Sequence, residues 1–249
     1  MKIENDKLIF DNSNIKRKKI TGHSFVDMAG LNPYAKIGDV VLERLGYLKQ
    51  DVPEKYLLRG DYAEKIVRAI YERDGHKCTI YDKDKIHYDN MPENKDFGGL
   101  IDIDLLEENS LVEVKSKSMS DYDKILREKP AWEVMQGCYY AYLKGKESFT
   151  MEWIFFDPLT EREVFANQPV TTLANLKRIS QKYNMNEKTL NYTKGLLDKV
   201  LNYYNKCLSE GAIPLEDISD RALEQLGLER PQIDFMGEIG ATLFGTLTF

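Results

Sequence analysis

The sequence predicts an α/β fold, in which helices and strands alternate along a chain of 249 residues. Two observations carry this prediction. Two short apolar runs, residues 100–106 and 111–114, flank a polar break at 107–110, and this pattern is typical of a β-hairpin. Helical spacing of apolar residues follows Arg59 on one side of the hairpin and Ala131 on the other.

The composition is that of an ordinary soluble globular protein, with 31% charged and 42% hydrophobic residues. The length suffices for one domain with a real core. No apolar run approaches the ~20 residues of a membrane span, and the first residues do not resemble a signal peptide. Cys78, Cys138 and Cys207 form no metal-binding motif and favour a reducing cytoplasm. The net charge of −6 argues mildly against nucleic acid as a partner, although local patches and bound metals decide binding.

The hairpin carries the residues with the clearest chemistry. Side chains alternate along a strand, which predicts that Asp102 and Asp104 share one face and that Glu113 and Lys115 share another. Acids beside buried apolar runs need an electrostatic partner, and a divalent cation is a natural one. Two carboxylates and the Val114 carbonyl would suit Mg²⁺, and Lys115 would hold or help deprotonate the attacking water. Spacing alone leaves two questions open: which aspartate is the ligand, and whether this is only an amphipathic hairpin with a charged face.

The chain before the hairpin opens with a polar lead-in, residues 1–14. The four cations of residues 16–19 are either a solvated patch or a phosphate clamp. Ser24 is expected to cap a short helix that ends at Gly30, and a second helix is expected at 39–45. A longer helix from Arg59 ends at Gly75. Two short strands, 77–81 and 85–88, are expected to follow around an Asp-Lys-Asp turn.

The chain after the hairpin begins with a polar segment, 118–129, that we expect to be a loop over the site. Pro130 is a typical helix start, and the helix at 131–143 places Gln136 and Tyr140 on one face. The remaining expected elements are a strand at 149–156, a turn after Asp157, a return strand at 163–166 and a helix capped near Asn186 that reaches residue 208.

Several of these segments carry motifs of a known nuclease family. Gly99-Leu-Ile-Asp102 followed by Glu113-Val-Lys115 resembles the core of the PD-(D/E)XK nucleases, with Gly-x-x-Asp in place of Pro-Asp. The segments 20–24 and 30–34 are similar to the opening of the YqaJ-like, lambda-exonuclease-type viral recombinases, although Gly22 and His23 depart from the usual small pair. Two more motifs match in family order, Gly60-x-x-x-Glu64 and Gln136-x-x-x-Tyr140.

The resemblance implies a restriction-endonuclease-like PD-(D/E)XK core, with a mixed central sheet flanked by helices. Asp102, Glu113 and the Val114 carbonyl would bind the main Mg²⁺, for which Mn²⁺ can substitute. Glu64 would support that ion or help to bind a second one. The alternative without a function is that Glu64 is a surface acid near a helix N-terminus. Gln136 and Tyr140 would fix the geometry of the site, and Arg17, together with Ser24, would contact a 5′-phosphate.

The activity that the resemblance implies is Mg²⁺-dependent exonuclease digestion of linear double-stranded DNA from 5′ to 3′. A ring-shaped homotrimer, a single-strand annealing protein as partner, and phage or prophage recombination in the bacterial cytoplasm are further implications. Two alternatives remain: a structure- or site-specific endonuclease on the same core, and a catalytically inactive DNA-binding relative.

The domain organisation expected from these patterns is an exonuclease domain at 1–210 and a C-terminal extension at 211–249. Within the extension, residues 214–226 indicate one short helix. The tail 233–249 is apolar, contains several glycines and is almost uncharged, so it would tend to associate with other apolar surfaces if exposed. We expect it to pack on the domain, on another subunit or on a partner.

Overall fold

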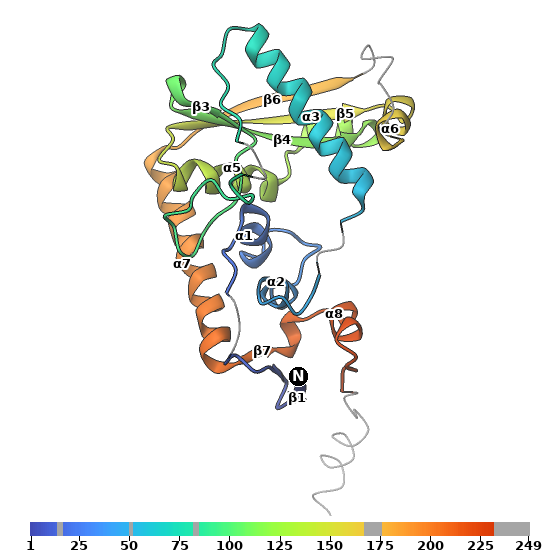
Figure 1. Ribbon diagram of the computed structural model, residues 1–249, viewed down its shortest axis with the longest axis vertical. Coiled ribbons are helices and arrows are strands. Elements are labelled where there is room, and N and C mark those ends of the chain that lie inside the picture. Colours follow the sequence, from blue (N-terminus) through green and yellow to red (C-terminus); the bar gives the residue numbers. More distant parts are fainter. Residues whose placement is uncertain (14–16, 50–51, 82–84, 167–175, 232–249) are drawn as a thin grey trace, which may run out of the picture.

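The computed structural model describes residues 1–13, 17–49, 52–81, 85–166 and 176–231 (Figure 1). A four-stranded mixed sheet lies near one end of the molecule, in the order β3-β4-β5-β6. The β3–β4 and β5–β6 pairs are antiparallel, whereas β4 and β5 are parallel. The strands span Ile103–Leu105, Ser110–Ser118, Ser148–Phe156 and Lys177–Asn184. This mixed sheet, flanked by helices, confirms the predicted fold class.

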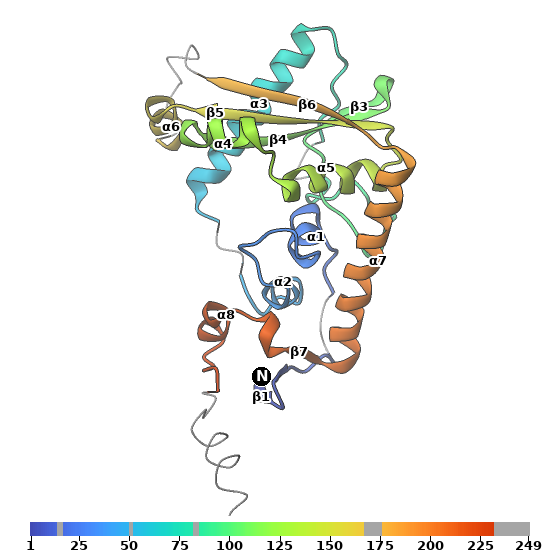
Figure 2. The same cartoon turned by 180° about the vertical axis from the view of Figure 1, so that it is seen from behind.

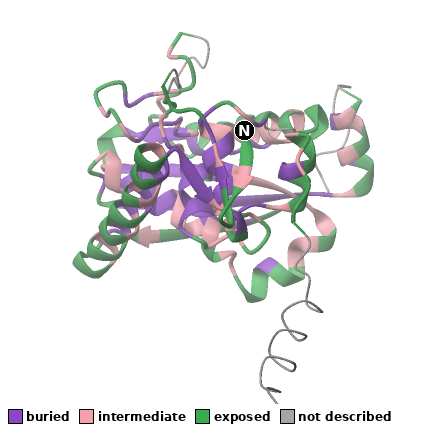
Figure 3. Ribbon diagram, turned by 90° about the horizontal axis from the view of Figure 1, so that it is seen from below, coloured by how far each residue is buried: buried purple, intermediate pink, exposed green. Residues whose placement is uncertain are grey.

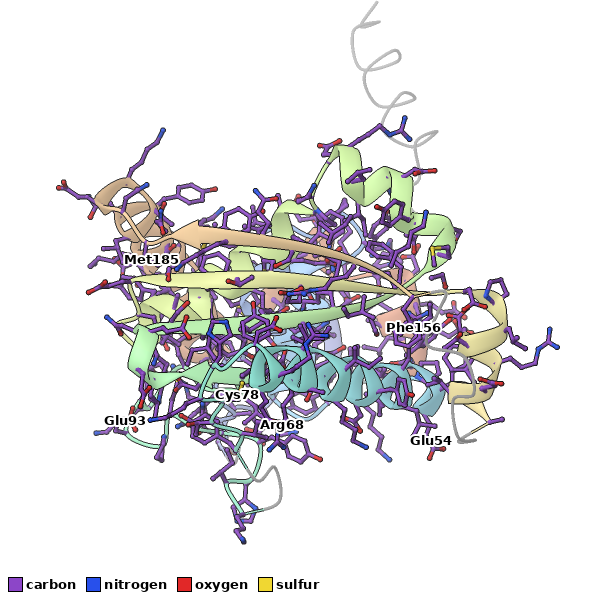
Figure 4. The ribbon with its side chains drawn as sticks, turned by 90° about the horizontal axis from the view of Figure 1, so that it is seen from above. Glu54, Arg68, Cys78, Glu93, Phe156 and Met185 are labelled. Carbon is purple, nitrogen blue, oxygen red and sulfur yellow. The ribbon has the colours of Figure 1, made fainter. Side chains whose placement is uncertain are left out.

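The two faces of this sheet are covered by different helices (Figures 1 and 2). Helix α3 (Glu54–Arg73) crosses one face, where Val112 and Val114 of β4 belong to its hydrophobic cluster. Seen from above, Glu54 at the start of α3 lies toward the end of the sheet where β5 finishes at Phe156 (Figure 4). Helix α5 (Ala131–Leu143) packs on the opposite face, which leaves alternate residues of β4 pointing toward it.

A second layer continues away from the sheet beyond α5. Helix α1 (Gly22–Met28) packs on α5, and α2 (Ile37–Arg44) packs on α1. Helix α7 (Glu187–Glu210) runs along one side of the molecule from the large sheet to a small antiparallel one (Figure 2). The small sheet has the order β1-β2-β7, formed by Lys2–Glu4, Lys7–Ile9 and Ala212–Pro214. The shorter helices are α4 (Tyr122–Arg127), α6 (Pro158–Phe165) and α8 (Asp220–Gln225).

One hydrophobic core connects the α5 face of the sheet with this second layer (Figure 3). Its large buried side chains include Trp153 of β5, Tyr139 of α5 and Tyr204 of α7. Leu8 of β2 and Ile213 of β7 belong to the same cluster, so the described part of the C-terminal extension packs on the rest of the chain. The division at residue 210 stays a prediction, and the tail 233–249 lies outside the described residues. Among the described helices, none has the length and apolar character needed to cross a bilayer.

Several predicted elements are confirmed. The central hairpin forms from β3 and β4, and α5 has the predicted bounds, with Pro130 at its N-cap. The strand at 149–156 is β5, and Asn186 caps α7 through a side-chain hydrogen bond to Thr189 N. The helices expected at 39–45 and after Arg59 are α2 and α3, although α3 begins earlier, at Glu54.

Other predicted elements are wrong near the N-terminus and before the hairpin. The polar lead-in is the β1–β2 hairpin, whose turn residues Asn5 and Asp6 have φ of 48° and 56°. Ser24 does not cap a helix, because α1 already begins at Gly22 after the N-cap Thr21. Neither expected strand at 77–81 and 85–88 forms: Thr79 makes only an isolated bridge to Asp104, and 85–88 is a turn. The turn at 82–84 lies outside the described residues.

The remaining wrong predictions follow the hairpin. The expected loop 118–129 contains helix α4. The expected turn after Asp157 is the start of α6, because the Asp157 side chain accepts hydrogen bonds from Leu159 N and Thr160 N, with Pro158 in the first turn. The expected return strand 163–166 therefore falls on α6 and the residue after it, and the strand that pairs with β5 is β6. The single helix expected at 214–226 is a short strand end, a 3₁₀ turn and α8.

Candidate active site

The candidate site begins where β3 diverges from β4. The β3–β4 ladder extends from Leu105 and Ser110 to Ile103 and Val112, and beyond it β4 pairs with β5 alone. Asp102 precedes β3 and directs its carboxylate to this open edge, where Oδ2 accepts a 2.7 Å hydrogen bond from Val114 N. The N–H and C=O of one strand residue point to the same edge, so the Val114 carbonyl faces the side on which Asp102 lies.

The adjacent cluster forms on the face of β4 that points toward α5. Glu113 and Lys115 share this face, as the alternation of strand side chains predicts. Lys115 Nζ donates to Glu113 Oε1 at 2.7 Å and to Gln136 Oε1 of α5 at 2.9 Å. The structure thus brings the predicted Glu-x-Lys pair and the predicted glutamine into one hydrogen-bonded group.

The electrostatics of this group suit a bound cation. Glu113 is 2% exposed, and its Oε2 is buried without a hydrogen-bond partner among the described residues. Burial raises the pKa of Glu113, and this outweighs the lowering by the Lys115 charge. Burial alone would lower the pKa of Lys115, but the negative charges of Glu113 and Asp102 outweigh it and the pKa is raised. A divalent cation at the orphaned oxygen would offset the cost of keeping Glu113 ionised.

Glu64 reaches the neighbourhood of the site from α3. It lines a cleft of about 320 Å³ together with Asp61 and Asp102, and its charge contributes to raising the pKa of Glu113. In the described part of the chain, no three His, Cys, Asp or Glu side chains form a ready-made metal cluster. The donor set that fits an ion is therefore two carboxylates, Asp102 and Glu113, with the Val114 carbonyl. Hard oxygen donors of this kind match Mg²⁺, which keeps several water ligands.

Tyr140 has a packing environment that fixes α5 against the rest of the site. It is 4% exposed, and its ring lies against two glycines. A Cβ at Gly99 would lie 2.8 Å from the Tyr140 hydroxyl oxygen, and one at Gly22 would lie 2.8 Å from its Cζ. Gly99 also has a φ of +127°, which side-chain-bearing residues rarely adopt. Tyr140 therefore joins α5 to α1 and to the segment that leads into Asp102.

Asp104, the alternative ligand in the sequence, lies in a different environment. It is completely buried, its Oδ1 accepts from Lys146 Nζ at 2.5 Å, and its Oδ2 accepts from the Tyr81 hydroxyl at 2.8 Å. Both of its oxygens are thus engaged within the protein, whereas Asp102 borders the cleft that contains Glu64. The geometry favours Asp102, whose role as the ligand stays a prediction.

Arg17 and Ser24 differ in accessibility. The Arg17 side chain is 36% exposed, donates to Asp96 Oδ1 at 2.6 Å and lies 5.3 Å from the centroid of the Tyr204 ring. Its segment runs beside the residues that lead to Asp102, with Ile20 N donating to Asp96 O at 2.8 Å. Ser24 is 2% exposed, with its Oγ 3.2 Å from Thr21 Oγ1. Arg17 is thus partly accessible, although its guanidinium pairs with Asp96, whereas Ser24 is enclosed. Both roles stay predictions.

Three further residues adjoin the site without having been predicted. Lys117 lies on the same face of β4 as Lys115, and its Nζ donates to Glu133 Oε1 of α5. Glu133 is buried, and its Oε2 accepts a 2.6 Å hydrogen bond from Trp153 Nε1. The spacing Glu113-x-Lys115-x-Lys117 points to Lys117, and the three-residue step from Glu133 to Gln136 points to Glu133, whereas no sequence signal points to Trp153.

A mixed sheet that carries an aspartate where two strands diverge, and Glu-x-Lys on the next strand, defines the PD-(D/E)XK fold. Solved structures share it. An alkaline exonuclease from Laribacter hongkongensis superposes with a TM-score of 0.51 at 14% identity, over 77% of this chain and 90% of that one. A phage-related exonuclease from Haemophilus somnus 129PT gives 0.55 at 14% identity, over 78% and 97%. The Laribacter enzyme in complex with dAMP gives 0.52, also at 14%.

No protein-family model and no curated protein sequence matches the chain. The structural comparison confirms the resemblance to the YqaJ-like exonucleases at the level of the fold.

Proposed function

We propose that the protein is a Mg²⁺-dependent deoxyribonuclease, an exonuclease that hydrolyses phosphodiester bonds of linear double-stranded DNA from 5′ to 3′. The observation that carries the proposal is the hydrogen-bonded group of Glu113, Lys115 and Gln136, with Glu113 Oε2 left without a partner and Asp102 held at the adjacent Val114 N. The exonuclease fold of the neighbouring structures supports the choice of reaction.

Each residue of the group has a distinct role in this proposal. Asp102, Glu113 and the Val114 carbonyl would hold the main ion, and Glu64 would support it or help to hold a second; Mn²⁺ would substitute. When bound, the metal supplies Lewis-acid polarisation of the phosphate and lowers the pKa of water. Lys115, which Glu113 and Gln136 hold by hydrogen bonds, orients the attacking water and offsets the negative charge that develops on the phosphate.

The proposal extends to the biological setting that the family resemblance implies. Arg17 would meet the 5′-phosphate of a DNA end, which favours an enzyme that starts at ends. In this setting the protein would form a homotrimer that encloses the DNA and would act with a single-strand annealing protein. The process would be phage or prophage recombination in the bacterial cytoplasm.

The test uses one duplex in two forms, linear with 5′-phosphates and covalently closed circular, incubated with Mg²⁺ or with a chelator. We expect digestion of the linear form alone and only with Mg²⁺, and label placed at either end reports the direction. Lys115→Ala should lower the rate ~10²–10³-fold, since it removes a transition-state contact. Because it also leaves the buried Glu113 without its cationic partner, the rate is compared at a temperature where circular dichroism shows that the variant is folded. Lys199→Ala, at an exposed position of α7, is the matched control.

The alternatives give different results in the same assay. Cleavage of the closed circle would replace the exonuclease with an endonuclease. Binding of both forms without cleavage of either would indicate an inactive relative.

A further inference from the structure

A second hollow adjoins the candidate active site on the side of α4. It has a volume of about 460 Å³ and lies between the turn that follows α1, helix α4 and the start of α5. Its size is within the range of about 300–1,000 Å³ that is usual for small-molecule sites. The lining that matters for the argument consists of two aromatic residues and three lysines: Tyr34, Trp132, Lys117, Lys124 and Lys129.

One member of the aromatic pair is strongly exposed. Tyr34 is 83% exposed, the highest exposure among the large hydrophobic side chains of the described residues. Its ring centroid lies 6.4 Å from that of Trp132, and the two ring planes are at 89°. An exposed tyrosine held edge-on to a half-buried tryptophan contributes little to a core, but it offers a surface on which a nucleobase can stack.

The hollow also carries lysines that can contact phosphates. Three lysines line it against two carboxylates, Asp121 and Glu128, whereas the whole chain has a net charge of −6. Lys124 is exposed, and Lys117 is held in place by Glu133. Because Glu133 already pairs with Lys117, Lys124 and Lys129 are the lysines that phosphates would contact, next to a ring on which a base can stack.

The hollow is continuous with the candidate active site through Lys117. Lys117 lines the hollow and follows Lys115 by two residues on the same face of β4, a step of ~6–7 Å along the strand. A strand that contacts Lys117 in the hollow would therefore lie two residues of β4 away from Lys115. Inside a duplex, neighbouring base pairs cover both faces of each base, and only a terminal pair leaves one face open. A base that stacks within a strand running through the hollow is therefore an unpaired one.

We propose that this hollow is a binding subsite for an unpaired stretch of a DNA strand, with a base stacked on Tyr34 and phosphates on the lysines. The assignment of DNA as the strand rests on the proposed function. The subsite would hold the separated strand next to the bond that is cleaved.

The test measures binding of a short fluorescent oligothymidylate to the full chain in a chelator, so that no cleavage occurs. Tyr34→Ala should weaken binding about five- to a hundredfold, the loss typical of one stacked base. Tyr34→Phe keeps the ring and should bind as the wild type does. Tyr192→Ala, at an exposed tyrosine of α7, is the matched control and should have no effect. Unchanged binding by Tyr34→Ala, or equal losses for the alanine and phenylalanine variants, would overturn the proposal.

Two further arms separate the possible failures. A polyglutamate peptide of the same length that displaces the oligonucleotide at equal concentration would replace the DNA strand with an acidic protein segment. Cleavage of linear duplex, measured in parallel, tests the proposed function by itself. If the duplex is cleaved but binding does not depend on Tyr34, only the subsite proposal is wrong. If binding depends on Tyr34 but the duplex is not cleaved, only the nuclease proposal is wrong.

Discussion

Replacing Asp104 by asparagine would remove one half of a buried ion pair. The side chains of Asp104 and Lys146 are 1% and 6% exposed, and their charged atoms are 2.5 Å apart. Asparagine has nearly the same size but cannot neutralise the Lys146 ammonium, which would remain charged in the interior. Breaking a buried pair in this way lowers the free energy of unfolding by about 3–5 kcal/mol.

The expected change is large enough for thermal unfolding to measure. For a chain of this size, 1 kcal/mol corresponds to about 2–4 °C, so the melting temperature should fall by roughly 6–20 °C. Lys146→Met should cause a similar loss, because it leaves the Asp104 carboxylate unpaired. The double variant Asp104→Asn with Lys146→Met removes both charges and should be more stable than Asp104→Asn alone.

The activity of the same variants decides which aspartate binds the metal. Asp104→Asn should retain Mg²⁺-dependent cleavage at a temperature where it is folded, because both Asp104 oxygens face Lys146 and Tyr81. Asp102→Asn should lose cleavage with a small change in melting temperature. If Asp104→Asn melted like the wild type and had no activity, Asp104 would be the ligand and our assignment of Asp102 would be wrong.

Two further predictions address the DNA end and the packing of the site. Arg17→Ala should weaken binding of a 5′-phosphorylated duplex by about ten- to a hundredfold and affect a 5′-hydroxyl duplex much less, whereas Asp96→Asn, which frees the guanidinium, should not weaken either. Equal losses on both ends would remove Arg17 from end recognition. Gly99→Ala should destabilise the fold by about 1–3 kcal/mol in urea, because of its positive φ and its contact with Tyr140, and Tyr140→Phe should recover part of that loss. Wild-type stability of Gly99→Ala would refute the close packing.

The elements that could be predicted from the sequence are those with local signals. Pro130 marks the start of α5 because a proline there loses no helical hydrogen bond, and its φ suits the first turn. Asn186 marks the start of α7, and Gly211 in the left-handed conformation marks its end. The central hairpin has two apolar runs around a short polar break, so its signal is also local.

The elements that escaped prediction depend on ambiguous or distant signals. Asp157-Pro158 is a turn signal and also a helix start, and only the structure shows the hydrogen bonds that make it the cap of α6. The β1–β2 hairpin carries a local signal in Asn5-Asp6, both with positive φ, but its sheet is completed by β7, some 200 residues later in the chain. No short-range pattern predicts that pairing.

The candidate site also has parts that local sequence signals predict and parts that they do not. Alternation along β4 places Glu113 and Lys115 together and needs only the sequence. The contact of Asp102 with Val114 N depends on where β3 stops pairing, and that point is set by the surrounding packing. Glu133, the buried partner of Lys117, and Trp153, which donates a hydrogen bond to Glu133, come from two other elements, so only the structure shows that they meet.

Helix α5 orders the charged side chains of the hairpin. A Glu-x-Lys strand alone would leave Lys115 and Lys117 mobile in solvent, since long exposed side chains lose conformational entropy when they are ordered. Gln136 and Glu133, one turn apart on α5, hold these two lysines in place on the face of β4. Tyr140 is one of the contacts that hold α5 next to the hairpin, and its position leaves no room for a side chain at Gly99. The glycine of the Gly-x-x-Asp motif therefore acts on the lysines through the helix, and its substitution should disturb them even though it touches neither.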